Sequence, residues 1–285
     1  MKTNTSHQYY SPRLAKIAFY PIKSCAPIRV ASWDIASTGL TYDRRWMLVD
    51  EEGKFLSQRR VPLMATLTTH LGDDHIRVER SKGSSCTIPL QQPLPGKRVD
   101  VRLHGSTRLA CETSTSANTW FSETLNTTCR LVESVPHEDP WRNEEPEANS
   151  ANTYFPDLYP ILITNEKSLE DLFPHGNIPM DRFRPNLVVK DANAFAEDEW
   201  ESIEIGNTQL KLVKPCARCQ VTTVDQTTGV QSGTEPLKTL RERRRWHGKA
   251  VFGWNVLVQT SGRIQINDSI NIRTTHAKSV FIGPK

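Results

Sequence analysis

The sequence predicts a mainly β protein of the α+β class. Short runs rich in β-branched and aromatic residues dominate the chain, and turn residues separate them. Few stretches carry the 3.6-residue periodicity of an amphipathic helix. Strands at such regular spacing favour barrels or sandwiches over a parallel α/β sheet.

Each predicted strand is one of these runs, bounded by turn residues. The segments Glu51–Lys54 and Ile205–Thr208 are predicted hairpin turns, because Gly53 and Gly206 can adopt a positive φ without strain. The predicted strands are Leu14–Tyr20, Arg45–Asp50, Thr66–His70, Ile76–Glu79, Val99–Leu103, Tyr159–Thr164, Asn186–Val189, Ser202–Ile205, Thr208–Val213, Gln220–Asp225, Asn255–Thr260 and Ile270–Arg273.

Capping signals predict helices in three places. One covers Ser116–Leu125, after Ser and Thr residues that suit an N-cap. A second covers Lys167–Phe173, after Thr164 or Asn165. A third covers Glu235–Arg244, with Pro236 in the first turn, where its missing N–H costs little.

A polar segment divides the chain. His137–Asn152 is acidic, contains Pro140 and Pro146, and has few apolar residues, which indicates a linker or a long surface loop. The sequence therefore predicts an N-terminal part over 12–136 and a C-terminal part over 150–275.

Composition limits the classes of protein to which the chain can belong. The chain has 285 residues and a net charge of +4, which is too weakly basic to argue for a nucleic-acid partner. Its apolar runs are far shorter than the roughly 20 residues of a membrane-spanning helix. The N-terminus lacks the apolar stretch of a secretory signal, so we expect a cytoplasmic protein without a membrane span.

The cysteines are unevenly spaced, which does not suggest a disulfide framework in a chain of this length. Only the last two lie close together. The six are Cys25, Cys86, Cys111, Cys129, Cys216 and Cys219.

The run Lys214–Cys219 reads KPCARC and is the strongest local motif. A structural zinc site needs four ligands, and neither a second CxxC nor a His pair lies nearby. A thioredoxin-like pair opens a helix, whereas the β-rich run Gln220–Asp225 follows here. Two interpretations remain open on chemistry alone. The cysteines are structural, or one is a thiolate ligand of a soft or high-valent metal, favoured by the cations Lys214 and Arg218.

The motif and several other segments resemble the MOSC family, which is named for the C-terminal domain of molybdenum cofactor sulfurase. The resemblance covers about 13–273, in the family's order. Its further segments are Tyr20–Cys25 (YPIKSC), Gly39–Val49 (GLTYDRRWMLV), Asp181–Val189 (DRFRPNLVV), Ala196–Trp200 (AEDEW), Val221–Gly229 (VTTVDQTTG) and Gly229–Leu237.

This resemblance implies an N-terminal MOSC-type β-barrel domain packed on a C-terminal MOSC β-barrel domain. Within the family, the chain is most similar to the amidoxime-reducing component and the bacterial 6-hydroxylaminopurine-resistance proteins. These reduce N-hydroxylated compounds at a molybdenum held by a pterin dithiolene and one cysteine. By that resemblance Cys219 is the metal ligand and the catalytic residue, and the role of Cys216 stays open.

The resemblance also implies the residues that contact the molybdenum cofactor, an anionic pterin phosphate. Lysine and arginine suit its phosphate, and the Asn186 amide offers a donor and an acceptor to the pterin edge. Asp157 aligns with a family position near the pterin, although Leu158 and Tyr159 replace the usual small polar pair. The expected contacts are Lys23, Ser24, Arg44, Asp157, Arg184, Asn186 and Arg218.

The expected function is therefore reduction of N-hydroxylated small molecules such as amidoximes and hydroxylamines. No cysteine follows Cys219, so a plant-type ferredoxin domain is not expected, nor is the membrane segment of the mitochondrial relatives. Electrons should come from a separate flavoprotein reductase, ferredoxin or cytochrome-b5-like protein.

Arg241–Lys249 is either a solvated helix end or a cationic rim for an anionic cofactor or an acidic partner. Two alternatives to a reductase remain. The first is a protein that carries the molybdenum cofactor or sulfur without turnover, and the second is a basic adaptor that binds an acidic partner.

Overall fold

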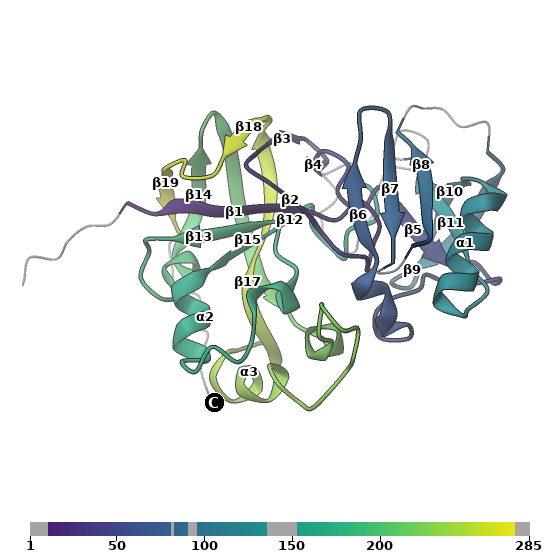
Figure 1. Ribbon diagram of the computed structural model, residues 1–285. Coiled ribbons are helices and arrows are strands. Elements are labelled where there is room, and N and C mark those ends of the chain that lie inside the picture. Colours follow the sequence, from purple (N-terminus) through teal and green to yellow (C-terminus); the bar gives the residue numbers. More distant parts are fainter. Residues whose placement is uncertain (1–10, 81–82, 91–95, 136–152, 277–285) are drawn as a thin grey trace, which may run out of the picture.

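A computed structural model of the protein describes residues 11–80, 83–90, 96–135 and 153–276, so the predicted linker 137–152 lies outside the described residues. The described residues form four sheets and a few short helices, which confirms the mainly β class. Figure 1 shows two bodies side by side. One contains a large sheet with α2 and α3, and the other contains smaller sheets with α1. None of the described helices is both long and apolar enough to cross a membrane.

The large sheet takes strands from both ends of the chain. Its order is β19-β14-β15-β17-β12-β13-β1-β2, with β16 paired to β17. The N-terminal strand β1 pairs antiparallel with β13, so the first strand completes the sheet of the C-terminal half. The strands are β1 Arg13–Phe19, β2 Ile28–Val30, β12 Ile161–Asn165, β13 Leu187–Lys190, β14 Trp200–Ile205, β15 Thr208–Ala217, β16 Arg245–Trp246, β17 Lys249–Thr260 and β19 Ile270–Thr275.

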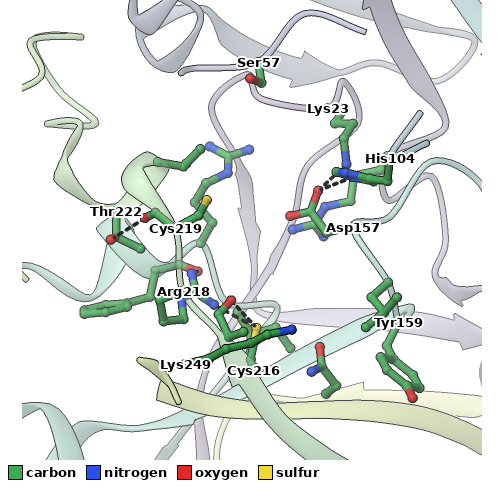
Figure 2. Close-up of a pocket in the computed structure, with 18 of the residues that line it drawn as sticks. Lys23, Ser57, His104, Asp157, Tyr159, Cys216, Arg218, Cys219, Thr222 and Lys249 are labelled. Carbon is green, nitrogen blue, oxygen red and sulfur yellow. Dashed lines mark hydrogen bonds and ion pairs between the residues drawn. The ribbon is translucent and has the colours of Figure 1, made fainter. Parts of the chain in front are cut away.

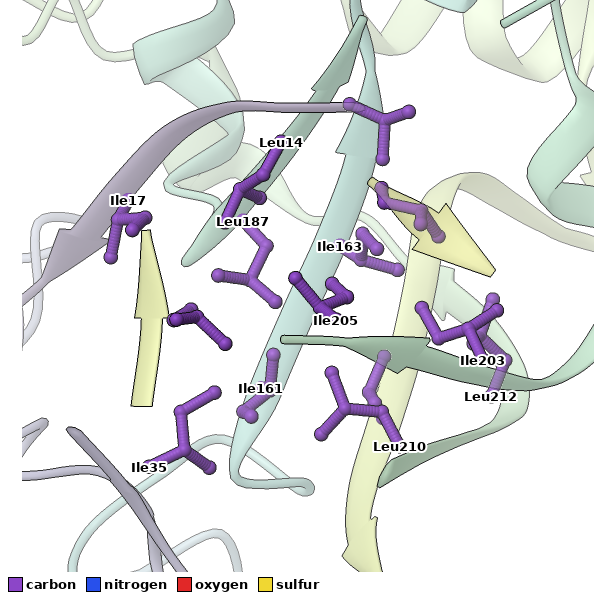
Figure 3. Packing of buried hydrophobic residues seen from close by; sticks show 14 of the residues in the cluster. Leu14, Ile17, Ile35, Ile161, Ile163, Leu187, Ile203, Ile205, Leu210 and Leu212 are labelled. Atoms are coloured by element: carbon purple, nitrogen blue, oxygen red, sulfur yellow. The ribbon is translucent and has the colours of Figure 1, made fainter. Parts of the chain in front are cut away.

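The principal core lies inside this curved sheet. Figure 3 shows Leu14 and Ile17 of β1 converging on Ile163, Leu187 and Ile205 from later strands. All five side chains are at most 1% exposed. Burying such a side chain contributes roughly 1.5–3 kcal/mol, so the N-terminal strand is held mainly by its apolar face.

The second body has its own core and contains α1, Thr115–Leu125. Ser114 caps this helix, because its hydroxyl accepts the Ala117 N–H at 3.2 Å. One sheet has the order β5-β11-β10-β9 and another the order β6-β7-β8. The strands are β5 Trp46–Val49, β6 Thr68–Leu71, β7 His75–Glu79, β8 Ser85–Pro89, β9 Arg98–Leu103, β10 Ser106–Glu112 and β11 Arg130–Ser134.

A small sheet and short helices complete the fold. The sheet β18-β3-β4 joins an early segment to a late one. Its strands are β3 Ser32–Ala36, β4 Gly39–Leu40 and β18 Gly262–Gln265. The helices are η1 Pro62–Thr66, α2 Glu166–Leu172, η3 Met180–Phe183, η4 Ala196–Asp198, η5 Gln220–Thr223 and α3 Leu237–Arg243.

The three predicted helices are confirmed as α1, α2 and α3, and Gly53 and Gly206 adopt φ of 77° and 58° in the predicted turns. The strand predicted at Gln220–Asp225 is wrong, because this segment begins with the 3₁₀ helix η5. Its threonine hydroxyls bond back to local carbonyls, Thr222 to Cys219 at 2.9 Å and Thr223 to Gln220 at 2.8 Å. Such bonds stabilise a turn in a run that is otherwise rich in strand-forming residues.

Candidate functional site

A cavity of about 610 Å³ is lined by residues from both halves of the chain. It lies beside the end of β15 and the start of β17, facing loops that follow β1, β4 and β9. Every site residue that the sequence predicted lines this cavity, and so does Cys216. Those residues are Lys23, Ser24, Arg44, Asp157, Arg184, Asn186, Arg218 and Cys219.

The cysteine motif leaves β15 at the cavity wall. The Arg218 N–H donates to the Ala250 carbonyl of β17 at 2.8 Å, which fixes the position of the motif. The Cys219 carbonyl accepts the N–H and the hydroxyl of Thr222, at 3.1 and 2.9 Å, so the backbone of Cys219 starts η5. Its thiol is exposed and points into the cavity (Figure 2).

Arg218 connects this motif to the neighbouring wall. Its Nη1 donates to the Cys216 Sγ at 3.0 Å, and its Nη2 donates to the Phe183 carbonyl at 2.6 Å. The Nε of Arg218 is buried and has no hydrogen-bond partner among the described residues. A buried donor without a partner is costly, so this part of the guanidinium is less well satisfied than its two terminal nitrogens.

Lys23 is 4% exposed and lies on the opposite side of the cavity (Figure 2). Its ammonium donates to the Asp157 carboxylate and, at 3.1 Å, to the Phe155 carbonyl. Burial lowers the pKa of Lys23, and Asp157 opposes that effect. Although burial opposes its ionisation, Lys23 and His104 hold the pKa of Asp157 well below its usual range. His104 Nε2 lies 3.3 Å from Asp157 Oδ1, a contact that the sequence did not suggest.

Two arginines lie over one tyrosine ring. The guanidinium carbons of Arg44 and Arg184 are 4.6 and 4.3 Å from the centre of the Tyr20 ring. Arg44 forms an ion pair with buried Asp43. Arg184 bonds instead to neutral acceptors, the Cys25 carbonyl at 2.8 Å and Gln226 Oε1 at 3.1 Å. Burial lowers the pKa of Arg184, as expected for a cation that lacks a close carboxylate partner.

Three of the predicted site residues have a backbone conformation that costs free energy. Ser24, Arg44 and Arg184 have φ of 73°, 52° and 54°, in the left-handed region that is unfavourable for residues with a Cβ. Such conformations cost roughly 1–3 kcal/mol each and persist where surrounding contacts enforce them, often at functional sites.

A pair of glutamines connects the two halves behind these residues. Gln58 Nε2 donates to Gln226 Oε1 at 3.0 Å, and Gln226 Nε2 donates back to Gln58 Oε1 at 2.9 Å. Gln58 is fully buried and also donates to the Ser24 carbonyl at 2.8 Å. Because Gln226 also accepts a hydrogen bond from Arg184, the two glutamines together support Ser24 and Arg184.

Asn186 forms several hydrogen bonds within the protein at the cavity wall. It is 1% exposed, and its Nδ2 donates to the Ala18 carbonyl at 3.2 Å. Its Oδ1 accepts the Leu162 N–H at 3.1 Å and Arg44 Nη1 at 3.2 Å. These bonds tie Asn186 into the fold at the cavity wall, and its expected contact with a pterin edge stays a prediction. The arrangement suits orientation of Arg44.

Comparisons with known proteins agree with this architecture. The MOSC N-terminal beta barrel domain matches residues 11–128, and the MOSC domain matches residues 151–271. Mitochondrial amidoxime-reducing component 1 of Mus musculus is 30% identical over 275 residues, which cover 90% of this chain and 81% of that protein. The chain belongs to the MOSC family. The human protein of the same name is 29% identical, with coverage of 90% and 82%.

A second kind of MOSC relative is longer. Molybdenum cofactor sulfurase of Oryza sativa subsp. japonica is 30% identical over 267 residues, which cover 84% of this chain and 32% of the sulfurase. The MOSC chain therefore corresponds to about a third of that protein.

The charges around the MOSC cavity are unbalanced. The cationic side chains that line it greatly outnumber the carboxylates, of which the lining includes only Asp157 among the described residues. A concave surface of one sign attracts ligands of the opposite sign. The cations are Lys23, Arg44, Arg59, Arg184, Lys214, Arg218 and Lys249.

The basic segment Arg241–Lys249, predicted as a solvated helix end or a cationic rim, is mostly exposed, but one of its arginines is buried. Arg244 is 6% exposed and forms an ion pair with Asp198 at 2.7 Å. Arg243 forms an ion pair with Asp171 at 2.7 Å. Trp246 and Lys249 line the MOSC cavity. Folding therefore buries Arg244, which the local charge pattern could not distinguish from its exposed neighbours, whereas Arg243 stays exposed in its ion pair.

Proposed function

We propose that this chain is a molybdenum-cofactor-dependent reductase of N-hydroxylated compounds. The observation that carries the proposal is the convergence, in one cavity, of an exposed thiol with two buried cations, Lys23 and Arg184, and further cations that are more exposed. The match to amidoxime-reducing components over most of their length supports the same activity.

The donors around the cavity fit the cofactor. Cys219 offers a soft thiolate ligand, while Lys23, Arg44 and Arg184 offer charged donors to an anionic phosphate. When bound, the cofactor supplies the two-electron redox chemistry that no side chain provides.

In this scheme the protein's residues bind and orient the cofactor. Reduction of an amidoxime to an amidine consumes two electrons and two protons and releases water. We propose that Cys219 fixes the metal end, that Lys23, Ser24, Arg44 and Arg184 fix the phosphate and pterin, and that Asp157 holds the Lys23 ammonium in place. Electrons come from a separate redox protein.

The test is molybdenum and pterin content, together with turnover of benzamidoxime by reduced methyl viologen, in protein from a host that makes the cofactor. Cys219→Ser should abolish turnover, because an alkoxide is a poor substitute for the thiolate. Cys216→Ser is the matched control three residues away and should retain turnover. Equal loss of metal and turnover in both variants would contradict the assignment of Cys219.

A second candidate function is delivery of the cofactor or of sulfur without turnover. It is favoured by the second thiol in the cavity, whose Sγ accepts from Arg218, and by the resemblance to a sulfurase. Loaded protein that fails to reduce benzamidoxime, yet passes cofactor to an apo-molybdoenzyme and activates it, would favour delivery.

A further inference from the structure

The hairpin of β16 and β17 presents two side chains to the cavity that the proposed cofactor contacts do not use. Trp246 and Lys249 are directly opposite in the β-ladder and both line the cavity. The two residues between them, His247 and Gly248, have φ of 46° and 76°. Positive φ at both turn positions is typical of the tight type I′ hairpin, so the aromatic ring and the ammonium are held as cross-strand neighbours.

This hairpin lies at the thiol end of the cavity. The carbonyl of Ala250, next to Lys249, accepts the Arg218 N–H at 2.8 Å, and Ala217 of the cysteine motif pairs with Val251. Figure 2 shows Lys249 beside Cys216, across the cavity from Lys23, His104 and Asp157. A group bound between the hairpin and Cys219 would therefore be separate from the Lys23 wall.

Trp246 and Lys249 offer two different kinds of contact to a ligand. Lys249 is exposed, and its ammonium has no hydrogen-bond or ion-pair partner among the described residues. Trp246 is half-buried and packs edge-on against His247, with ring centres 4.4 Å apart. An indole ring offers a flat apolar surface, and an adjacent unpaired ammonium attracts a carboxylate or phosphate.

We infer that Trp246 and Lys249 select planar N-hydroxylated substrates that carry a negatively charged group. This inference rests on the proposed reductase function and names its substrate class. Lys249 contacts the anionic group, Trp246 covers the flat part of the molecule, and the N–O group faces the thiol end.

The experiment compares benzamidoxime with 4-carboxybenzamidoxime, which differ by one carboxylate, using reduced methyl viologen as reductant. Lys249→Met removes the ammonium and keeps the chain length. Lys238→Met is the matched control, because Lys238 is exposed on α3, outside the cavity lining, and gives the same change in net charge. We expect wild-type protein to have the higher kcat/KM for the carboxylate substrate. Lys249→Met should reduce this preference about fivefold, the effect of a partly exposed ion pair, and Lys238→Met should leave it unchanged.

A binding measurement makes the test independent of turnover. Calorimetry should show tighter binding of 4-carbamoylbenzoate than of benzamide, with the difference lost in Lys249→Met and restored in Lys249→Arg. Trp246→Leu should weaken the binding of both compounds. Equal substrate preference in Lys249→Met and Lys238→Met, at unchanged melting temperature, would overturn the inference. Failure of wild-type loaded protein to reduce either amidoxime would contradict the proposed function instead, while the binding comparison would still test the hairpin.

Discussion

Replacing Arg184 by alanine should empty the cavity of cofactor more than it unfolds the protein. Arg184 is 8% exposed, and its two hydrogen-bond acceptors, the Cys25 carbonyl and Gln226 Oε1, are neutral. The cation therefore remains available to an anionic ligand. A charge-assisted hydrogen bond contributes roughly 1.5–3 kcal/mol, which corresponds to a loss of about tenfold or more in cofactor affinity.

The same substitution has a smaller effect on folding. Two hydrogen bonds from the charged guanidinium are lost, at roughly 1.5–3 kcal/mol each. Removal of a buried cation that lacks a carboxylate partner offsets most of this loss, since a desolvation penalty of several kcal/mol disappears. Relief of the positive φ is small, because alanine at this position has the same backbone preference as arginine.

The assay measures molybdenum and pterin per folded chain, together with the melting temperature and the stabilisation of cofactor-free protein by inorganic phosphate. Arg182→Ala is the matched control, because Arg182 is also largely buried but does not line the cavity. Arg184→Ala should lose most cofactor and phosphate stabilisation, and Arg182→Ala should lose neither. Full occupancy in Arg184→Ala would refute the idea that this guanidinium holds the anionic end of the ligand.

Three further predictions concern one support of the site and two buried charged groups of the fold. Gln226→Met should lower cofactor occupancy. Its effect and that of Arg184→Ala should not add in the double variant, because the two side chains share a hydrogen bond. Additive losses in the double variant would contradict this coupling. Burial, assisted by Asp198, raises the pKa of Glu197 to about 7 from 4.5, so the folded state keeps a proton that the unfolded state loses. The free energy of unfolding should therefore fall as pH rises from about 4.5 to about 7, and urea titrations should show a shallower fall in Glu197→Gln. Arg244→Met should destabilise the fold by about 3 kcal/mol, because it leaves Asp198 without its buried cation; Arg241→Met, at an exposed site, should change urea stability by less than about 0.5 kcal/mol.

The site residues that could be predicted from the sequence lie in short local motifs. Lys23 and Ser24 are adjacent, Arg184 and Asn186 flank one proline, and Arg218 and Cys219 end the KPCARC run. All of them line the cavity. The resemblance of these motifs to the MOSC family carried the signal, because on chemistry alone the two cysteines could equally have been structural.

The residues that were missed act through contacts distant in sequence. Gln58 and Gln226 are 168 positions apart, and the Tyr20 hydroxyl reaches the Pro185 carbonyl across 165 positions. An isolated glutamine or tyrosine has no local pattern that distinguishes it from a surface or core residue. The role of β1 in the C-terminal sheet was missed for the same reason, because pairing with β13 leaves no mark on either strand alone.

One contact explains how two ends of a single ligand can be held in a fixed relation. The Arg218 side chain donates to the carbonyl of Phe183, the residue immediately before Arg184, and the Arg218 backbone immediately precedes Cys219. Main-chain bonds to β17 hold Arg218, and the Gln58–Gln226 pair holds Arg184. A ligand bound by a thiolate at one end and by a cation at the other tolerates little variation in the separation of the two. Arg218 therefore serves the site less by its charge than by joining the cysteine motif to the arginine motif, which are more than thirty residues apart in the chain.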